Sequence, residues 1–236
     1  LHLGVQGMEH PQTDADIVVL AGDIARPAQA VAWAQGFGKP VLYVPGNHEF
    51  YGASHAQVLA ELQRLSQGTR VQLLDNRSVT LAGVRFVGST LWSDFRIFAS
   101  EEQRQQAMEQ AQRFMYDFSR IRMGPEPGDA LFTPQDAAAL YDANLLWLRA
   151  ALAEPFDGPT VVMLNDKWHA DWKVSVDGAA APLLRCNYLM RGVLVPAGQH
   201  RIDFRFAPSR SGFYLSLSMM IFVLGWVAYD FGRRRG

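Results

Sequence analysis

Residues 17–23 read IVVLAGD and residues 41–49 read VLYVPGNHE, and these two stretches decide the fold. In each of them, a short run of apolar residues is followed by a glycine and then by polar side chains. Short apolar runs of this kind are typical of buried strands. Because an α/β sheet presents its chemistry at the carboxyl ends of its strands, we predict an α/β fold with functional residues directly after these runs.

The residues between the two runs predict a helix. Pro27 is a favourable first helical residue, and we expect the helix to extend to about Gln35, with a turn over residues 36–39. Two strands that are joined by a helix in this way should lie parallel in one sheet, with a right-handed crossover.

Further helices and strands are expected up to residue 158. The predicted helices cover residues 54–66, residues from about 100 to 118, and residues 133–153, and the predicted strands cover residues 71–74, 79–81 and 84–87. The second helix is inferred from apolar residues three and four positions apart, namely Met108, Ala111, Met115 and Phe118. The third begins at Thr133, a capping residue that is followed by proline.

The pattern of apolar and polar residues changes after Gly158. A strand is predicted over residues 160–164, and apolar and polar residues then alternate over residues 172–176 and again over residues 201–206. Asp177-Gly178 is typical of a hairpin turn. This pattern predicts a small antiparallel β unit with one dry face.

The C-terminal segment has a different character. No residue from Ser211 to Tyr229 is charged, and Arg233, Arg234 and Arg235 follow it. As a helix this segment would be about 28 Å long, close to the thickness of a bilayer core, so we predict a membrane-spanning or membrane-lying helix over residues 211–231. The alternative is a buried helix or strand pair in a soluble core.

Composition limits the classes of function. The 236 residues carry a formal net charge of −1, so nothing indicates a nucleic-acid partner. The single cysteine, Cys186, excludes a disulfide within the chain.

Gly22-Asp23 and the run Gly46-Asn47-His48-Glu49 together resemble the calcineurin-like metallophosphoesterases, a family of two-metal phosphate-ester hydrolases. The resemblance implies that Asp23 bridges two divalent cations (Mn, Fe or Zn) and that Asn47 ligates the second of them. It also implies that His48 approaches the phosphate and leaving group, and that Glu49 orients His48. The alternative for each is local structure: a strand-to-helix turn with Asp23 as cap, turn chemistry at Gly46-Asn47, and a surface histidine at 48.

Leu1-His2-Leu3 resembles the first motif of the same family, Asp-x-His, with its aspartate preceding the numbered chain. The resemblance then makes His2 a ligand of the first metal. The histidine-bearing motifs expected further along do not occur: residues 161–166 read VVMLND, and there is no Gly-His-x-His. About four of roughly seven protein ligands of a two-metal site are therefore missing, and we expect weak metal occupancy and weak or absent activity. His169 and Asp171 could replace the missing ligands, or His169 could be an edge histidine beside a turn.

A second resemblance covers the last third of the chain. Residues 171–178 (DWKVSVDG) and 191–200 (RGVLVPAGQH) look like the C-terminal region of bacterial membrane proteins of the YfhO type, in which a β unit precedes a last membrane helix and a basic tail. We therefore expect an incomplete metallophosphoesterase-type sandwich over residues 1–159, a YfhO-like β unit over 160–210, and a membrane helix with its tail over 211–236.

Two classes of function follow from these resemblances. The first is a phosphate-ester hydrolase that is tethered to a membrane, with the side of the membrane on which its N-terminal part lies left open. The second is a non-catalytic membrane-anchored module, or a fusion remnant that joins two incomplete domains.

Overall fold

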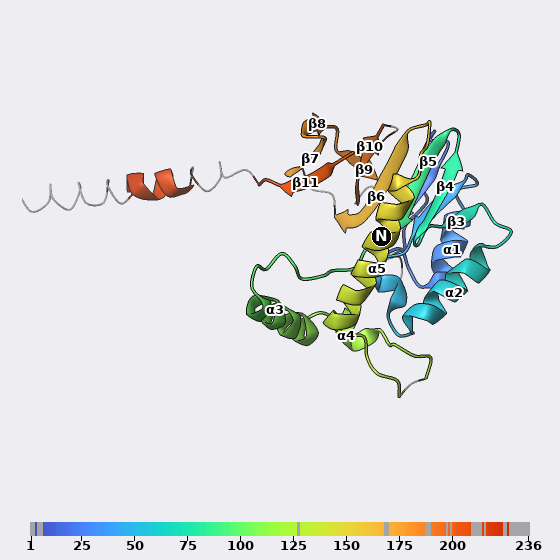
Figure 1. Ribbon diagram of the computed structural model, residues 1–236, viewed down its shortest axis with the longest axis horizontal. Coiled ribbons are helices and arrows are strands. Elements are labelled where there is room, and N and C mark those ends of the chain that lie inside the picture. Colours follow the sequence, from blue (N-terminus) through green and yellow to red (C-terminus); the bar gives the residue numbers. More distant parts are fainter. Residues whose placement is uncertain are drawn as a thin grey trace, which may run out of the picture.

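The structure is a computed structural model, and it describes residues 3, 7–126, 128–167, 170–186, 190–196, 198, 200–208, 214, 216–223 and 226. Three sheets and a set of helices form the body of the protein (Figure 1). The arrangement confirms an α/β fold at the level of class.

The first sheet contains the two stretches that decide the fold. Its strands are β1 (Val18–Ala21), β2 (Val41–Val44) and β3 (Val71–Leu73), in the order β1-β2-β3, and both pairs are parallel. Helix α1 (Pro27–Gln35) connects β1 to β2, and α2 (His55–Ser66) precedes β3. The parallel pairing and the helix that begins at Pro27 confirm the predictions for this unit.

The second sheet joins segments from both sides of residue 159. It consists of β4 (Arg77–Leu81), β5 (Val84–Ser89), β6 (Thr160–Lys167), β10 (Met190–Val195) and β9 (Leu184–Cys186), in that order. Strand β6 pairs parallel with β5 and antiparallel with β10. The sheet therefore continues across the boundary that the two resemblances place between residues 159 and 160.

The third sheet contains both alternating stretches of the predicted antiparallel β unit, whereas β6, β9 and β10, which also fall within residues 160–210, lie in the second sheet. The order of the third sheet is β11 (Ile202–Phe206), β7 (Trp172–Val176) and β8 (Ala179–Ala181), and every pair is antiparallel. Asp177 and Gly178 have φ values of 52° and 78°, as a tight hairpin turn with two left-handed residues requires. The predicted turn and the alternating strands are confirmed.

Alternation along the strands explains how the layers pack. In β2, Val41 and Tyr43 belong to the core that the helices cover, whereas Leu42 and Val44 belong to the core that also contains Phe86 of β5. Side chains of a strand point to opposite faces in turn, so the four apolar residues of β2 are all buried between two layers.

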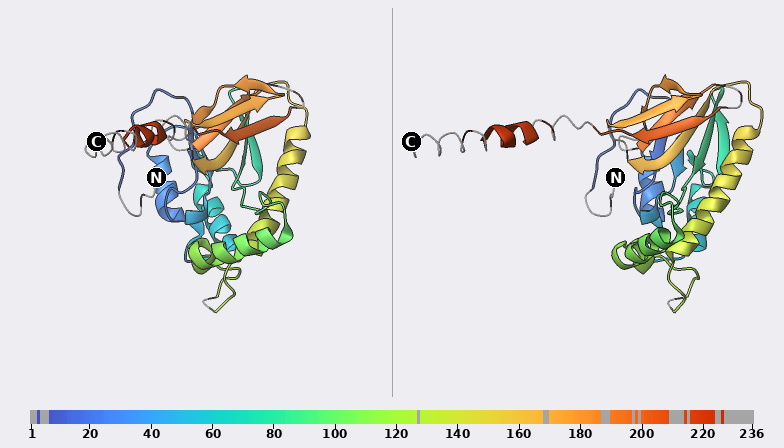
Figure 2. Two further views of the ribbon diagram at one scale, coloured as in Figure 1. Left: turned by 90° about the vertical axis from the view of Figure 1, so that its left-hand side faces the viewer. Right: turned by 60° about the vertical axis from the view of Figure 1, so that its left-hand side comes forward.

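The remaining helices cover one end of the body. Helix α5 (Pro134–Ala153) runs along the sheets, and α3 (Glu101–Phe114) packs against it (Figures 1 and 2). The capping box at Thr133 confirms the predicted start of α5. The prediction of one helix up to residue 118 is wrong, because Met115 is extended and α4 (Asp117–Arg120) forms a separate turn that buries Asp117 and Phe118.

The C-terminal segment is described only in part. Residues 214, 216–223 and 226 are helical, and Figures 1 and 2 show this helix projecting away from the sheets. Its large apolar residues are exposed, Met219 and Phe222 by 61% and 68%. Within the described part of the chain, no helix has both the length and the apolar character that are needed to cross a membrane. The rest of residues 211–231 lies outside the described part, so the membrane helix stays a prediction.

A methyl group at Gly88 would test the packing of the first sheet against the second. A Cβ at this position would lie 2.8 Å from Cβ of Leu74 and 2.8 Å from Cγ2 of Val44, so Gly88→Ala should lower the free energy of unfolding by about 1–3 kcal/mol. Urea denaturation measures the change. Gly128→Ala is the matched control, because its Cβ meets nothing within 4 Å, and equal effects of the two substitutions would contradict the packing described here.

Candidate metal and phosphate site

Asp23 lies in the tight turn that follows β1. Gly22 and Asp23 both have left-handed backbones, with φ values of 79° and 56°. Aspartate tolerates this conformation better than most residues. The N-cap of α1 is Arg26, which makes no side-chain capping bond, so Asp23 is not the helix cap that the alternative interpretation required.

The loop that follows β2 lies directly against this turn. A Cβ on Gly46 would lie 2.3 Å from Oδ1 of Asp23 and 2.6 Å from its backbone nitrogen. The backbone N–H of His48 donates a hydrogen bond to Oδ1 of Asp23 over 3.3 Å. The two motifs, which are separated by more than twenty positions in the sequence, therefore meet at one edge of the first sheet.

The side chain of Glu49 connects the loop after β1 to the loop after β2. This side chain is fully buried, and its carboxylate accepts four hydrogen bonds. Oε1 accepts from the Ile24 N–H (2.5 Å) and the Tyr43 hydroxyl (2.9 Å), and Oε2 accepts from the N–H groups of Asp23 (3.0 Å) and Gly46 (2.7 Å). One carboxylate thus satisfies backbone donors of both loops, a role that sequence analysis did not foresee.

Burial opposes the negative charge of this carboxylate. Desolvation first, and then the nearby charge of Asp23, raise the pKa of Glu49 to about 7, although the hydrogen bonds from Ile24, Tyr43 and Gly46 act in the opposite direction. Burial and the Glu49 charge also raise the pKa of Tyr43, so its hydroxyl remains a donor. The orientation of His48 by Glu49, which the resemblance implies, stays a prediction.

Asn47 is held by a residue that sequence analysis missed. Its amide nitrogen donates to Oδ1 of Asp117 over 2.5 Å, and the Tyr51 hydroxyl lies 3.4 Å from the same nitrogen and 3.5 Å from Oδ2 of Asp117. Asp117 is 6% exposed and comes from α4, seventy positions away. Because a carboxylate accepts and does not donate, it directs the nitrogen of Asn47 toward itself and leaves the side-chain oxygen for another partner.

His48 is half-buried beside an aromatic ring. Its imidazole stacks on Tyr51 with 4.6 Å between the ring centroids, and the Arg26 guanidinium donates to the His48 carbonyl over 3.4 Å. Burial and then the charge of Asp117 raise the pKa of Tyr51, which therefore stays a neutral phenol against the imidazole. This packing does not fit a freely exposed surface histidine.

Two of the predicted ligands cannot be placed. His2 and His169 lie outside the described residues. Asp171 precedes β7 in the third sheet, and its backbone carbonyl accepts a hydrogen bond from the Ala207 N–H over 2.9 Å. That His169 and Asp171 replace the missing metal ligands therefore stays a prediction.

The chemistry of the donors fits part of a metal site. The side-chain oxygens of Asp23 and Asn47 are hard ligands of the kind that Mg²⁺ and Mn²⁺ take. Among the residues that the structure describes, no three His, Cys, Asp or Glu side chains form a group that could hold a metal ion. Two oxygen donors are fewer than such a cation needs, so water would have to supply the remaining ligands.

Comparisons with known proteins identify no relative of the chain. No protein family matches the chain, and no curated protein and no solved structure matches it. The two resemblances therefore rest on their motifs alone.

Glu49→Gln should destabilise the protein, because two of the four donors would then face an amide nitrogen, which cannot accept a hydrogen bond, whereas the protonated carboxyl of wild type keeps acceptor lone pairs on both oxygens. We expect the free energy of unfolding to fall by about 2–4 kcal/mol at about pH 5. With its pKa at about 7, folded Glu49 keeps a proton that the unfolded chain releases from about 4.5 upward. Wild type should therefore lose stability relative to the variant as the pH rises through this window.

Urea denaturation in EDTA at about pH 5 and about pH 8 measures both effects. Glu9→Gln is the exposed control and should change little at either pH. The difference in the free energy of unfolding between wild type and Glu49→Gln should be smaller at about pH 8 than at about pH 5. An equal difference at the two pH values would contradict the raised pKa of Glu49.

Asp117→Ala should free the side chain of Asn47. In wild type, the short hydrogen bond to Asp117 should protect the Asn47 side-chain amide protons from exchange with water, and the substitution should abolish that protection. Nuclear magnetic resonance of ¹⁵N-labelled protein measures the exchange. Tyr51→Phe removes the two long contacts of the hydroxyl, of 3.4 Å to Asn47 and 3.5 Å to Asp117, but keeps the bond between Asn47 and Asp117. It should therefore keep most of the protection, and a larger effect of Tyr51→Phe would reverse the assignment.

Proposed function

We propose that the chain carries a metal-dependent phosphate-ester hydrolase domain of the metallophosphoesterase type, with weak or absent activity because its metal site is incomplete. The observation that supports this most is the close approach of Asp23 to the Gly46-Asn47-His48 loop. Asp23 and the loop that carries Asn47 and His48 meet there after two parallel strands, which agrees with the arrangement that the resemblance implies.

The described residues suggest a division of roles. Asp23 and Asn47 would hold a divalent cation, which when bound supplies positive charge toward phosphoryl oxygens and acidifies a water molecule. His48 lies next to Asp23 and would face the phosphate and the leaving group. Asp117 would keep the side-chain oxygen of Asn47 turned toward the cation, and Glu49 would keep the two loops in register.

A non-catalytic membrane module is the second candidate, and one observation favours it. The described C-terminal helix projects away from the sheets in Figures 1 and 2. Its large apolar residues are exposed: Tyr214, Met219, Met220, Ile221, Phe222, Val223 and Trp226. Exposed apolar surface of this kind is typical of a partner or membrane contact. In this case the N-terminal part would be a remnant that is joined to a YfhO-like β unit, and its α/β fold would carry no chemistry.

Manganese binding separates the two candidates. If the proposed hydrolase is correct, purified protein should bind Mn²⁺ in equilibrium dialysis, and Asp23→Ala should weaken binding at least about tenfold, because it removes one of two side-chain oxygens. Any Mn²⁺-dependent hydrolysis of an aryl phosphate should disappear with the same substitution. Asp14→Ala is the control, because Asp14 is an exposed aspartate in the N-terminal segment. Binding that Asp23→Ala leaves unchanged, or no binding together with partition into detergent, would favour the membrane module.

A further inference from the structure

A cavity of about 230 Å³ lies beside Asn47 and Asp117, and we call it the ring cavity. It lies where the loop after β5 meets α4. Asn47 belongs to the loop after β2, so this loop contributes to the cavity as well. Its remaining walls are formed by Thr90, Leu91, Trp92, Ser93, Phe95, Met115, Phe118 and Ala137. The cavity therefore opens next to the side chain that is proposed to hold the metal.

Most of the wall is apolar and aromatic. Trp92 is fixed by neighbouring rings, because its centroid lies 4.8 Å from that of Phe132 and 5.6 Å from that of Phe50. Phe118 is 4% exposed and stacks on Phe132 at 5.8 Å. A wall of rings that are held in the core keeps its shape without a ligand, which lowers the cost of binding.

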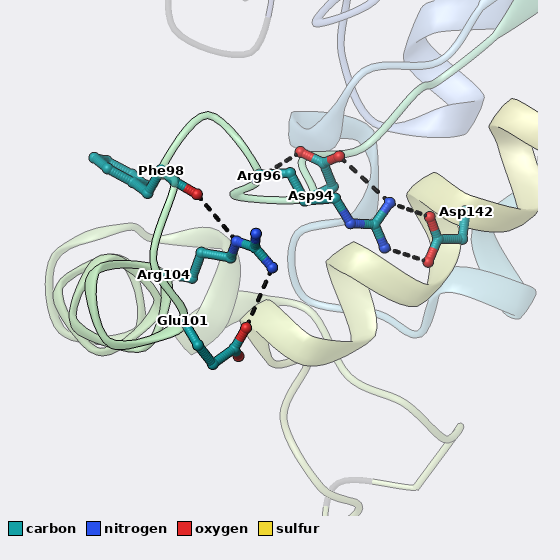
Figure 3. A network of polar contacts seen from close by, with 6 residues as sticks. All are labelled: Asp94, Arg96, Phe98, Glu101, Arg104 and Asp142. Carbon is teal, nitrogen blue, oxygen red and sulfur yellow. Dashed lines mark hydrogen bonds and ion pairs between the residues drawn. The ribbon is translucent and has the colours of Figure 1, made fainter.

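The loop that forms the other wall is strained and anchored. Leu91 and Phe95 have left-handed backbones, with φ values of 47° and 59°. Such conformations in large side chains are unfavourable and cluster at binding sites. Arg96 follows at once and forms two hydrogen bonds, of 2.6 and 2.7 Å, to the carboxylate of Asp142 on α5 (Figure 3). This ion pair fixes the strained loop on a rigid helix.

We propose that the ring cavity binds the alcohol part of a phosphate monoester, and that this part is a single uncharged aromatic ring. The proposal rests on the proposed function, because it places the phosphate at Asn47 and the ring in the cavity beside it. The apolar wall favours a ring, and the buried carboxylate of Asp117 disfavours a negatively charged organic group. The volume suits one ring, since an apolar cavity of about 150 Å³ accepts benzene.

Phenol tests the cavity without any metal. The methyl group of Met115, which lines the cavity, should shift in the NMR spectrum of metal-free protein as phenol is added. Met123 is the matched control, because both methionines are 48% exposed but Met123 does not line the cavity, so its methyl should stay in place. Leu91→Asn keeps a residue that tolerates a left-handed backbone while making the wall polar, and it should abolish the shift of Met115.

Phosphates then connect the cavity to the metal site. In the presence of Mn²⁺, phenyl phosphate should bind on the order of tenfold more tightly than inorganic phosphate, because burial of the ring adds to the binding energy. Leu91→Asn should remove this preference and leave the affinity for inorganic phosphate unchanged.

The outcomes separate the two proposals. If phenol shifts Met115 but neither phosphate binds, the cavity accepts an aromatic ring, whereas the proposed hydrolase and the assignment of that ring to a phosphate monoester both fail. If inorganic phosphate binds with Mn²⁺ while phenol leaves Met115 unmoved, or shifts Met115 and Met123 alike, the ring cavity is overturned. Equal affinities for phenyl phosphate and inorganic phosphate would overturn it as well.

Discussion

The buried carboxylate of Glu49 is the constraint on which the candidate site depends. Three backbone N–H groups, from Asp23, Ile24 and Gly46, point at its two oxygens, and these groups belong to loops after different strands. Buried backbone donors need acceptors, and the turn geometry leaves them facing inward. A single side chain thus fixes the distance between Asp23 and the loop that carries Asn47. The same requirement explains why position 46 has no room for a side chain.

Much of the fold could be predicted from local sequence. The apolar runs before Gly22 and Gly46, the proline at 27, the capping sequence at Thr133 and the Asp177-Gly178 turn each determine structure within a few residues. The approach of Asp23 to the loop after β2 was also predictable, because the carboxyl ends of parallel strands lie at the same edge of a sheet. The metal-binding and catalytic roles remain predictions.

Other features of the site arise from contacts that no local pattern records. Asp117 reaches Asn47 from seventy positions away, and helical spacing indicated only that its neighbour Phe118 faces inward. The same spacing predicted one helix up to residue 118, whereas the chain breaks at Met115 and turns so that Asp117 and Phe118 become buried. The role of Glu49 was hidden because the sequence suggests a partner of His48, not an acceptor for two loops. Tertiary hydrogen bonds decided these points, and propensity did not.

Strand β6 has a consequence for how the polypeptide can be divided. Its residues Val161 and Val162 enter two different cores, and its backbone pairs with β5 on one side and β10 on the other. A chain that stopped at residue 159 would leave β5 as an open edge strand, with unpaired backbone groups and a run of apolar side chains beside them. Such edges recruit strands from other molecules. The part that resembles a phosphoesterase therefore relies on β6, from the segment that resembles a membrane protein, to cover this edge.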